Sequence, residues 1–297
     1  MLQAAAHAAG AQQYPAGALY VVATPIGNLA DLTLRAIHVL AIVDAVACED
    51  TRVSARLLNH LGLSKPLLAV HEHNEREGAQ AVLARLARGE RVAYVSDAGT
   101  PAVSDPGAAL VAAAQAHGYR CVPVPGPSAA LAALSVAGDP LGKRFCFNGF
   151  LSARPAERTL ELTQAAHATH AQVLYEAPHR IEALASALAS ACPARRVTLG
   201  RELTKQFETI VTLPCADAPE WLAADKNRQR GEFVLVLHAM APADPGDSAI
   251  ADTDRVLTVL LRELPLKQAV AIAAELSAAP RNALYERALA LRNTEQD

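Results

Sequence analysis

The chain has 297 residues, of which 52% are hydrophobic and 19% are charged, so it can bury a sizeable core and is neither disordered nor fibrous. Its 27 lysines and arginines face 30 aspartates and glutamates, which excludes a uniformly basic surface for nucleic acid. Aromatic residues make up only 4% of the chain and supply few stacking platforms for single strands. A polyanion would have to be bound by a local patch.

The cysteines and the uncharged segments indicate the compartment. Five cysteines are scattered without a C-x-x-C pair, so we expect reduced thiols, no disulfide framework and no metal site. The first thirty residues carry no Asp, Glu, Lys or Arg, but no basic segment precedes an apolar run, so residues 1–17 are expected to form a flexible tail. Prolines at 123, 125 and 127 exclude a membrane helix over 121–138. We therefore predict a soluble, cytoplasmic protein.

From residue 19 onward, short Val-rich runs alternate with helical patterns. This alternation predicts a largely parallel sheet covered by helices. The expected strands are 19–23, 45–48, 67–70, 92–95 and 121–124, and the expected helices are 32–40, 53–61, 78–88, 106–117 and 128–136.

After residue 138 the pattern changes, because several predicted strands are too close together to enclose a helix. They are 145–148, 173–175, 196–200, 207–213 and 233–237, which indicates a mixed sheet in a second domain. Helical patterns at 256–264, 266–276 and 281–291 follow a segment rich in Pro, Ala and Asp.

The predicted fold class is α/β, with two α/β domains and a small C-terminal helical module. The expected parts are a tail over 1–17, an N-terminal α/β domain over 18–140, a C-terminal α/β domain over 141–240, a linker over 241–250, and a helix-turn-helix-like module over 251–297. Only the segment 143–240 is net positive, with twelve basic and ten acidic side chains. Its cations form either one binding face or an ordinary solvated surface.

Three loops at the ends of predicted strands carry features of a ligand site. The first, TPIGN at 24–28, lacks the G-x-G-x-x-G pattern of a dinucleotide cradle, so a dehydrogenase is disfavoured. The second, SDAGTPAVSDPG at 96–107, combines rigid turns with carboxylates. The third, PGPSA at 125–129, opens a helix whose amino end can receive a ligand. Each loop alone is also explained by turn and capping chemistry.

Together, and in this order, these loops resemble the tetrapyrrole methylase superfamily of S-adenosylmethionine-dependent (class III) methyltransferases. The chain is similar to the branch that methylates a ribose 2′-hydroxyl of small-subunit ribosomal RNA. The motifs are TPIGNLADLTLRA (24–36), EDTR (49–52), HNE (73–75), SDAGTP (96–101), PGPSA (125–129), YEAPHR (175–180), RELTK (201–205) and GEFVLVL (231–237). Tetrapyrrole methylases usually carry GPGD in the first loop, so PIGN favours the RNA branch.

The resemblance implies that S-adenosylmethionine lies between two α/β domains and is held largely by main chain. The matching cofactor-binding positions are Ile26, Val95, Ser96, Asp97, Thr100, Ser128, Ala129, Glu176 and Leu203. The resemblance also implies a homodimer whose partner is the small ribosomal subunit or its rRNA, with neither DNA nor a membrane bound.

Methyl transfer to a ribose oxygen requires alignment of the reacting atoms and a group that accepts one proton. The candidates are Glu49 and Asp50, the group around His73, and Glu202 with Lys205; we predict catalytic roles for Asp50, His73, Glu75 and Lys205. Asp50 could equally cap a helix and pair with Arg52, and His73 could serve loop hydrogen bonding. The predicted RNA-binding cations are Arg52, Arg180, Arg201 and Lys205.

The expected function is therefore 2′-O-methylation of a cytidine in 16S ribosomal RNA. A small-molecule methylase of the tetrapyrrole type is the enzymatic alternative, and a non-enzymatic ribosome-binding protein is the alternative from another class. The C-terminal module carries more acidic than basic residues, which argues against independent DNA binding. We treat docking of the ribosomal subunit as its hypothetical role.

Overall fold

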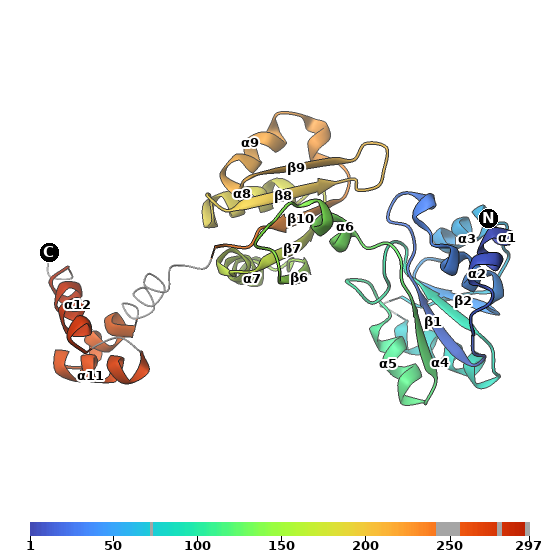
Figure 1. The fold of residues 1–297 in the computed structure, drawn as a ribbon, viewed down its shortest axis with the longest axis horizontal. Coiled ribbons are helices and arrows are strands. Elements are labelled where there is room, and N and C mark those ends of the chain that lie inside the picture. The colour runs from blue at the N-terminus through green and yellow to red at the C-terminus, as the bar shows by residue number, and fades with distance from the viewer. Residues whose placement is uncertain (72–73, 242–255, 278–280, 295–297) are drawn as a thin grey trace. The chain divides into compact units, whose positions relative to one another are not determined.

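The computed structural model describes residues 1–71, 74–241, 256–277 and 281–294. The chain divides into two compact units, Met1–Ala239 and Met240–Asp297. The first unit contains two five-stranded sheets, each covered by helices (Figure 1). None of the described helices is both long enough and apolar enough to cross a membrane.

The first sheet is parallel throughout, with strand order β3-β2-β4-β1-β5. Its strands are β1 (Ala18–Val22), β2 (Ala45–Cys48), β3 (Leu67–Ala69), β4 (Val92–Val95) and β5 (Arg120–Val124). Because all five run in one direction, the loops that follow them leave from the same edge, and β4 and β5 flank β1 there.

Both faces of this sheet are covered, which explains its apolar strands. Alternate residues of β4 serve opposite cores: Val92 and Tyr94 pack in one core, and Ala93 and Val95 in the other. The helices that follow the strands are α2 (Leu34–Ile42), α3 (Thr51–His60), α4 (Glu75–Ala87) and α5 (Ala108–Ala116), with a short 3₁₀ turn η1 (Leu29–Asp31) before α2.

The N-terminal segment corrects the expectation of a flexible tail over 1–17. Residues Leu2–Ala9 form helix α1, in which Ala5 and Ala9 are buried. Ala5 belongs to the same core as the residues of α2, and the carbonyl of Tyr14 accepts a hydrogen bond from Arg91 Nε at 3.0 Å. The small side chains of α1 allow close packing on that core, and the segment is thereby tied to the sheet.

The second sheet is mixed, as the closely spaced strands indicate, with order β6-β7-β10-β8-β9 and one parallel pair, β6 and β7. Its strands are β6 (Phe145–Phe150), β7 (Ala171–Glu176), β8 (Arg196–Arg201), β9 (Thr209–Pro214) and β10 (Phe233–Leu237). The accompanying helices are α7 (Pro155–His167), α8 (Ile181–Ala191) and α9 (Ala218–Ala223), with 3₁₀ turns η2 (Cys215–Asp217) and η3 (Lys226–Gln229). Strand β9 begins at Thr209 rather than at residue 207, so Phe207 lies in the loop before it.

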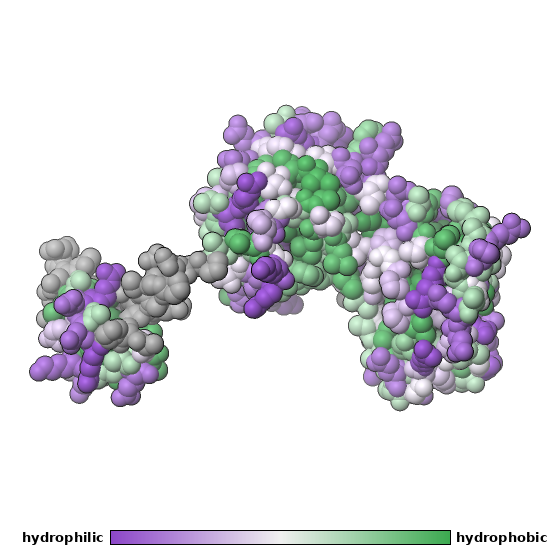
Figure 2. All heavy atoms as spheres, in the orientation of Figure 1, coloured by the Kyte–Doolittle hydropathy of each residue, from purple (hydrophilic) through white to green (hydrophobic). Residues whose placement is uncertain are grey.

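Helix α6 (Ala129–Val136) follows the last strand of the first sheet but packs on the second sheet. Its Ala130 and Ala133 share a core with Val173 of β7 and Val234 of β10. The proposed boundary at 140–141 thus assigns to the first domain a helix whose buried face belongs to the second sheet. Figure 2 shows an apolar patch on this part of the unit. Exposed apolar side chains at and after α6 are Leu131, Val136 and Leu141.

The C-terminal unit is helical where it is described, at 256–263, in α11 (Leu266–Leu276) and in α12 (Arg281–Thr294). Its core contains Leu257, Val270, Ala273 and Leu284. The helices predicted from the sequence therefore share one small apolar core. The predicted linker at 241–250 lies outside the described residues except for residue 241.

Ala5→Asp should lower the free energy of unfolding by at least about 2 kcal/mol, because it places an unpaired carboxylate in the contact between α1 and the core. Ala4→Asp is the matched control, since Ala4 is exposed on the same helix, and it should change stability by less than about 0.5 kcal/mol. Urea denaturation measures both. Equal stabilities of the two variants would contradict the packing of α1.

Candidate functional site

The three loops that follow β1, β4 and β5 are bound to one another. Thr24 and Gly99 exchange two backbone hydrogen bonds of 2.8 and 3.0 Å, and Thr24 Oγ1 donates to the carbonyl of Ser96 at 3.1 Å. Thr100 Oγ1 donates to the carbonyl of Pro127 at 3.0 Å. The hydroxyls of two threonines thus fix the loop after β4 against both neighbours.

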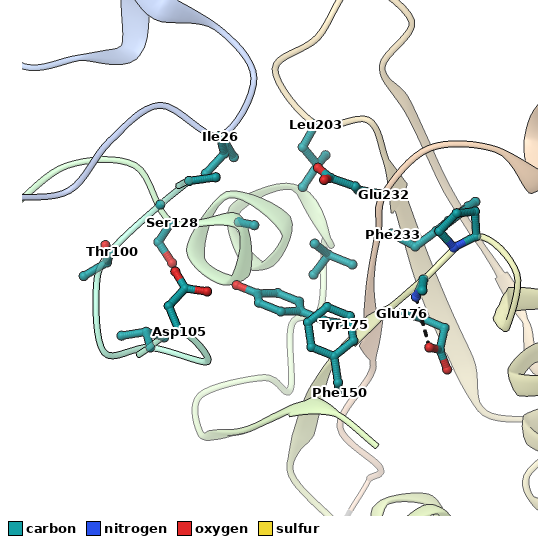
Figure 3. Close-up of a pocket in the computed structure, with 17 residues that line it drawn as sticks. Ile26, Thr100, Asp105, Ser128, Phe150, Tyr175, Glu176, Leu203, Glu232 and Phe233 are labelled. Carbon is teal, nitrogen blue, oxygen red and sulfur yellow. Dashed lines mark hydrogen bonds between the residues drawn. The ribbon is translucent and has the colours of Figure 1, made fainter. Parts of the chain in front are cut away.

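A cavity of about 370 Å³ lies where these loops face the second sheet. Figure 3 shows Ile26, Thr100, Asp105 and Ser128 on one side and Phe150, Tyr175, Glu176 and Leu203 on the other. The remaining lining residues are Ala98, Gly99, Val103, Ala129, Ala177, Pro178, Glu232, Phe233 and Val234. The wall is largely apolar and contains three carboxylates, Asp105 on one side and Glu176 and Glu232 on the other.

Six of the nine predicted cofactor-binding residues line this cavity. They are Ile26, Thr100, Ser128, Ala129, Glu176 and Leu203. The other three lie beside it: Val95 and Ser96 are buried, and Asp97 is exposed and accepts a hydrogen bond from the backbone nitrogen of Asp50 at 3.1 Å. Ser128 is the N-cap of α6 but its hydroxyl makes no cap bond, which leaves it for the cavity.

Sequence reasoning missed several lining residues, chiefly Asp105, Phe150 and Tyr175. The rings of Phe150 and Tyr175 meet edge-on with centroids 5.6 Å apart, and the Tyr175 hydroxyl accepts from the backbone nitrogen of Ala130 at 3.1 Å. The sequence signal that could have identified these two aromatic residues is their place at strand ends: Phe150 ends β6, and Tyr175 lies one residue before the end of β7.

Glu176 is the fully buried charge of the site, with a side-chain exposure of 0%. Its carboxylate contacts Arg158 Nη2 at 2.9 Å and Arg180 Nε at 3.1 Å, and it accepts from the backbone nitrogen of Ala177 at 3.0 Å. Arg180 in turn donates to the carbonyl of Leu151 at 2.7 Å. Glu176 is thereby held rigidly in the cavity wall.

Backbone strain in the described part of the chain is concentrated beside the cavity. Its non-glycine residues with positive φ are Ala102 (64°), Ser104 (71°), Glu202 (51°) and Thr204 (66°). The first two lie in the loop after β4, and the other two in the loop between β8 and β9. Such conformations persist only where surrounding contacts impose them, and they occur preferentially at functional sites.

Three carboxylates near the loop after β4 titrate above their usual range. Burial first, and then the charge of Asp97, raises the pKa of both Glu49 and Asp105, and burial also raises the pKa of Asp97. The buried hydroxyl of Tyr94 has no hydrogen-bond partner among the described residues, and burial followed by the charge of Glu49 raises its pKa. A Cβ atom at Gly107, whose φ is 122°, would collide with the Tyr94 ring.

The predicted catalytic residues are not brought together in the cavity lining. Asp50 caps α3 and pairs with Arg52, whose hydrogen bonds lower the Asp50 pKa to about 2. Glu75 accepts from the backbone nitrogen of Gly107 at 3.4 Å. His73 lies outside the described residues. The catalytic roles of all four predicted residues, Lys205 included, therefore stay predictions.

The predicted RNA-binding cations differ in whether a carboxylate of the protein already pairs with them. Lys205 Nζ contacts Glu202 at 2.8 Å and Glu232 at 2.9 Å. Burial works to lower the Lys205 pKa, but these two partners outweigh it and raise the pKa. Arg180 is committed to Glu176, and Arg52 pairs with Asp50 while its side chain is 85% exposed. Arg201 donates to carbonyls rather than to a carboxylate.

The residues of the cavity suit the cofactor that the resemblance implies. Main-chain groups of residues 98–100 and the apolar side chains of Ile26 and Leu203 match an adenosyl group, and the carboxylates match a ligand that carries an ammonium and a sulfonium charge. Among the described residues, no group of three or more His, Cys, Asp or Glu side chains could hold a metal ion.

Comparison with known proteins extends this picture to the whole chain. Residues 18–219 match the family of tetrapyrrole (corrin/porphyrin) methylases, and residues 247–292 match the RsmI C-terminal HTH domain. Ribosomal RNA small subunit methyltransferase I of Pseudomonas aeruginosa is 50% identical over 275 residues, which are 92% of this chain and 97% of the relative. The protein of the same name from Escherichia coli O157:H7 is 45% identical over 92% of this chain and 95% of the relative.

Solved structures agree on the fold. The methyltransferase CobJ superposes with a TM-score of 0.58 at 25% identity and covers 77% of this chain and 96% of its own. A uroporphyrin-III C-methyltransferase from Thermus thermophilus in complex with S-adenosylhomocysteine superposes with a TM-score of 0.52 at 19% identity, over 74% of this chain and 96% of its own. The chain therefore belongs to the tetrapyrrole methylase family, in the group of ribosomal RNA small subunit methyltransferase I.

Proposed function

We propose that this methyltransferase modifies the ribose 2′-oxygen of a cytidine in 16S ribosomal RNA. The observation that carries the proposal is identity of 45–50% over nearly the full length of relatives named ribosomal RNA small subunit methyltransferase I. The match includes the C-terminal module, which has its own family match. The proposed setting is the cytoplasm, with the small ribosomal subunit or its rRNA as partner.

We also propose a homodimer. The exposed apolar side chains of Leu131, Val136 and Leu141 supply surface that a second copy would cover.

The proposed methyl donor is S-adenosylmethionine, held by the nine predicted positions, six of which line the cavity. When bound, it supplies a methyl group already activated by a sulfonium. The protein then has to orient the ribose and receive the proton of its 2′-hydroxyl. Ile26 and Leu203 would hold the adenosyl group from two sides, and the free hydroxyl of Ser128 would serve a polar ligand group.

Asp105 is the proposed proton acceptor. Its carboxylate lines the cavity, unlike those of Asp50, Glu49 and Asp97. Burial and the neighbouring Asp97 raise the Asp105 pKa, which makes it a stronger base than an ordinary aspartate. The strained turns at Ala102 and Ser104 fix the loop that carries it.

A tritiated methyl transfer assay tests the function. Purified small subunits lacking the modification, naked ribosomal RNA and uroporphyrinogen are offered in parallel with labelled S-adenosylmethionine. We expect label in RNA that survives alkaline hydrolysis as a resistant dinucleotide, because 2′-O-methylation removes the hydroxyl that attacks the phosphate. Label in the porphyrinoid alone would refute the RNA assignment, and binding of the cofactor without any transfer would refute the substrate class.

Asp105→Asn should lower kcat about a hundredfold or more, since a positioned general base contributes roughly that much. The affinity for S-adenosylmethionine, measured by calorimetry, should change little. In the wild type, kcat should fall as the pH drops through the raised pKa of Asp105, because only the carboxylate accepts a proton.

Asp50→Asn is the matched comparison for this test. It should retain most of kcat, because Asp50 contacts Arg52 and the start of α3. If Asp50→Asn lost activity while Asp105→Asn kept it, the proton acceptor would be Asp50 as the sequence predicts.

A chain that ends at Met240 should bind S-adenosylmethionine like the full-length protein, because the cavity lies within Met1–Ala239. It should methylate subunits at least about tenfold less efficiently, as expected if the C-terminal module contributes docking contacts worth about 1.4 kcal/mol. Steady-state kinetics with subunits measures this. Equal efficiencies would refute a docking role.

A further inference from the structure

The loop between β8 and β9 presents an aromatic side chain to solvent. Phe207 is 70% exposed, more than any other aromatic residue in the described part of the chain. Its sequence neighbours Gln206 and Glu208 are also exposed. Exposure of most of a phenylalanine side chain forgoes the burial that favours folding, so the ring is a candidate for contact with a ligand.

Hydrogen bonds hold the backbone that carries this ring. Arg201 Nη1 donates to the carbonyl of Phe207 at 3.0 Å, and Arg201 Nε donates to the carbonyl of Arg230 at 2.6 Å. The backbone nitrogen of Thr204 donates to Glu208 Oε2 at 2.6 Å. With the positive φ of Glu202 and Thr204, these contacts define a single loop conformation.

The same loop extends from the cavity wall to the first sheet's loops. Leu203 lines the cavity, and the side chain of Lys205 lies so close to Gly27 that a Cβ atom there would collide with it. Gly27 follows Ile26, another lining residue. Figure 1 shows the loop between β8 and β9 reaching toward the loop after β1. Phe207 therefore lies a few residues beyond the point where the two walls of the cavity meet.

Arg201, which binds the carbonyls of both Phe207 and Arg230, and Arg230 itself have no carboxylate partner in the part of the chain that the structure describes. Arg201 gives its hydrogen bonds to the carbonyls of Arg230 and Phe207 and to the Thr209 hydroxyl, and Arg230 is exposed and forms no ion pair there. Their charge is thus available to an anion. Lys205, by contrast, is neutralised by Glu202 and Glu232.

We propose that Phe207 stacks on a nucleobase of the RNA substrate, next to the nucleotide whose ribose enters the cavity, while Arg201 and Arg230 contact the adjoining phosphates. This inference rests on the proposed function. An exposed aromatic ring on a hydrogen-bonded loop, among polar neighbours, offers the area of one base, and unpaired bases of RNA loops are bound by such stacking. A protein partner would require a wider apolar surface than the exposed, polar Gln206 and Glu208 provide.

The test compares Phe207→Ala, Phe207→Trp and Arg230→Gln in methylation of unmodified small subunits. Leu160→Ala is the matched control, because Leu160 is 60% exposed on α7. For each variant we measure kcat, the KM for subunits at several salt concentrations, the affinity for S-adenosylmethionine, the melting temperature and the oligomeric state by light scattering.

Phe207→Ala should raise the KM for subunits about tenfold or more, whereas Phe207→Trp should stay close to wild type. The dependence of this KM on salt should keep its slope, because stacking releases no counterions. Arg230→Gln should reduce that slope by about one, as expected for one lost phosphate contact. Cofactor affinity, melting temperature and the behaviour of Leu160→Ala should not change.

An unchanged KM for Phe207→Ala would overturn the inference. So would a change of oligomeric state, since Phe207 would then belong to an interface between protein chains. A wild-type protein that labels no RNA would instead refute the proposed function, and with it this inference. The two failures are distinguished by the wild-type reaction in the same assay.

Discussion

A carboxylate without access to solvent needs positively charged partners within hydrogen-bond distance, and Glu176 has two of them, Arg158 and Arg180. These ion pairs fix much of the cavity wall that the second sheet supplies. The two partners come from α7 and from the start of α8, and Arg180 continues to the carbonyl that follows β6. The Glu176 carboxylate thereby joins the end of β7, the loop after β6 and the helices α7 and α8. Loss of either arginine would leave the charge partly uncompensated, at a cost of about 3–5 kcal/mol, so the geometry of this wall depends on all three residues.

The opposite wall is built differently, from main chain rather than from charge. Thr24 and Thr100 fix the loop after β4 to its two neighbours through hydroxyl-to-carbonyl bonds, and strained turns set the direction of its tip. Backbone groups in fixed positions discriminate a ligand by shape and hydrogen bonding at little entropic cost. The carboxylates nearby are left with raised pKa values, which is typical of groups arranged for chemistry rather than for stability.

The strands of the first sheet and the three loops after them can be predicted from the sequence, because Val-rich runs, glycines and prolines mark them locally. The role of Asp105 is not, since Asp97 and Asp105 occur in similar turn sequences and only the fold determines which one lines the cavity. The sequence favours phosphate binding for Arg180, because its actual partner, the carbonyl of Leu151, is distant in the sequence and is brought to it only by the fold. Helix α1 was missed because its buried positions are alanines, Ala5 and Ala9, rather than the large apolar residues that mark the core face of a helix.

The contact between Tyr94 and Gly107 constrains which residues these two positions of the chain can hold. The phenol ring occupies the space that any side chain at position 107 would need, and the left-handed backbone there disfavours other residues as well. Burial, together with the charges of Glu49 and Asp105, acts on Tyr94 and raises its pKa. In this chain the two positions are therefore coupled: a side chain at position 107 would require a smaller residue in place of Tyr94, and the positive φ at position 107 would still disfavour it.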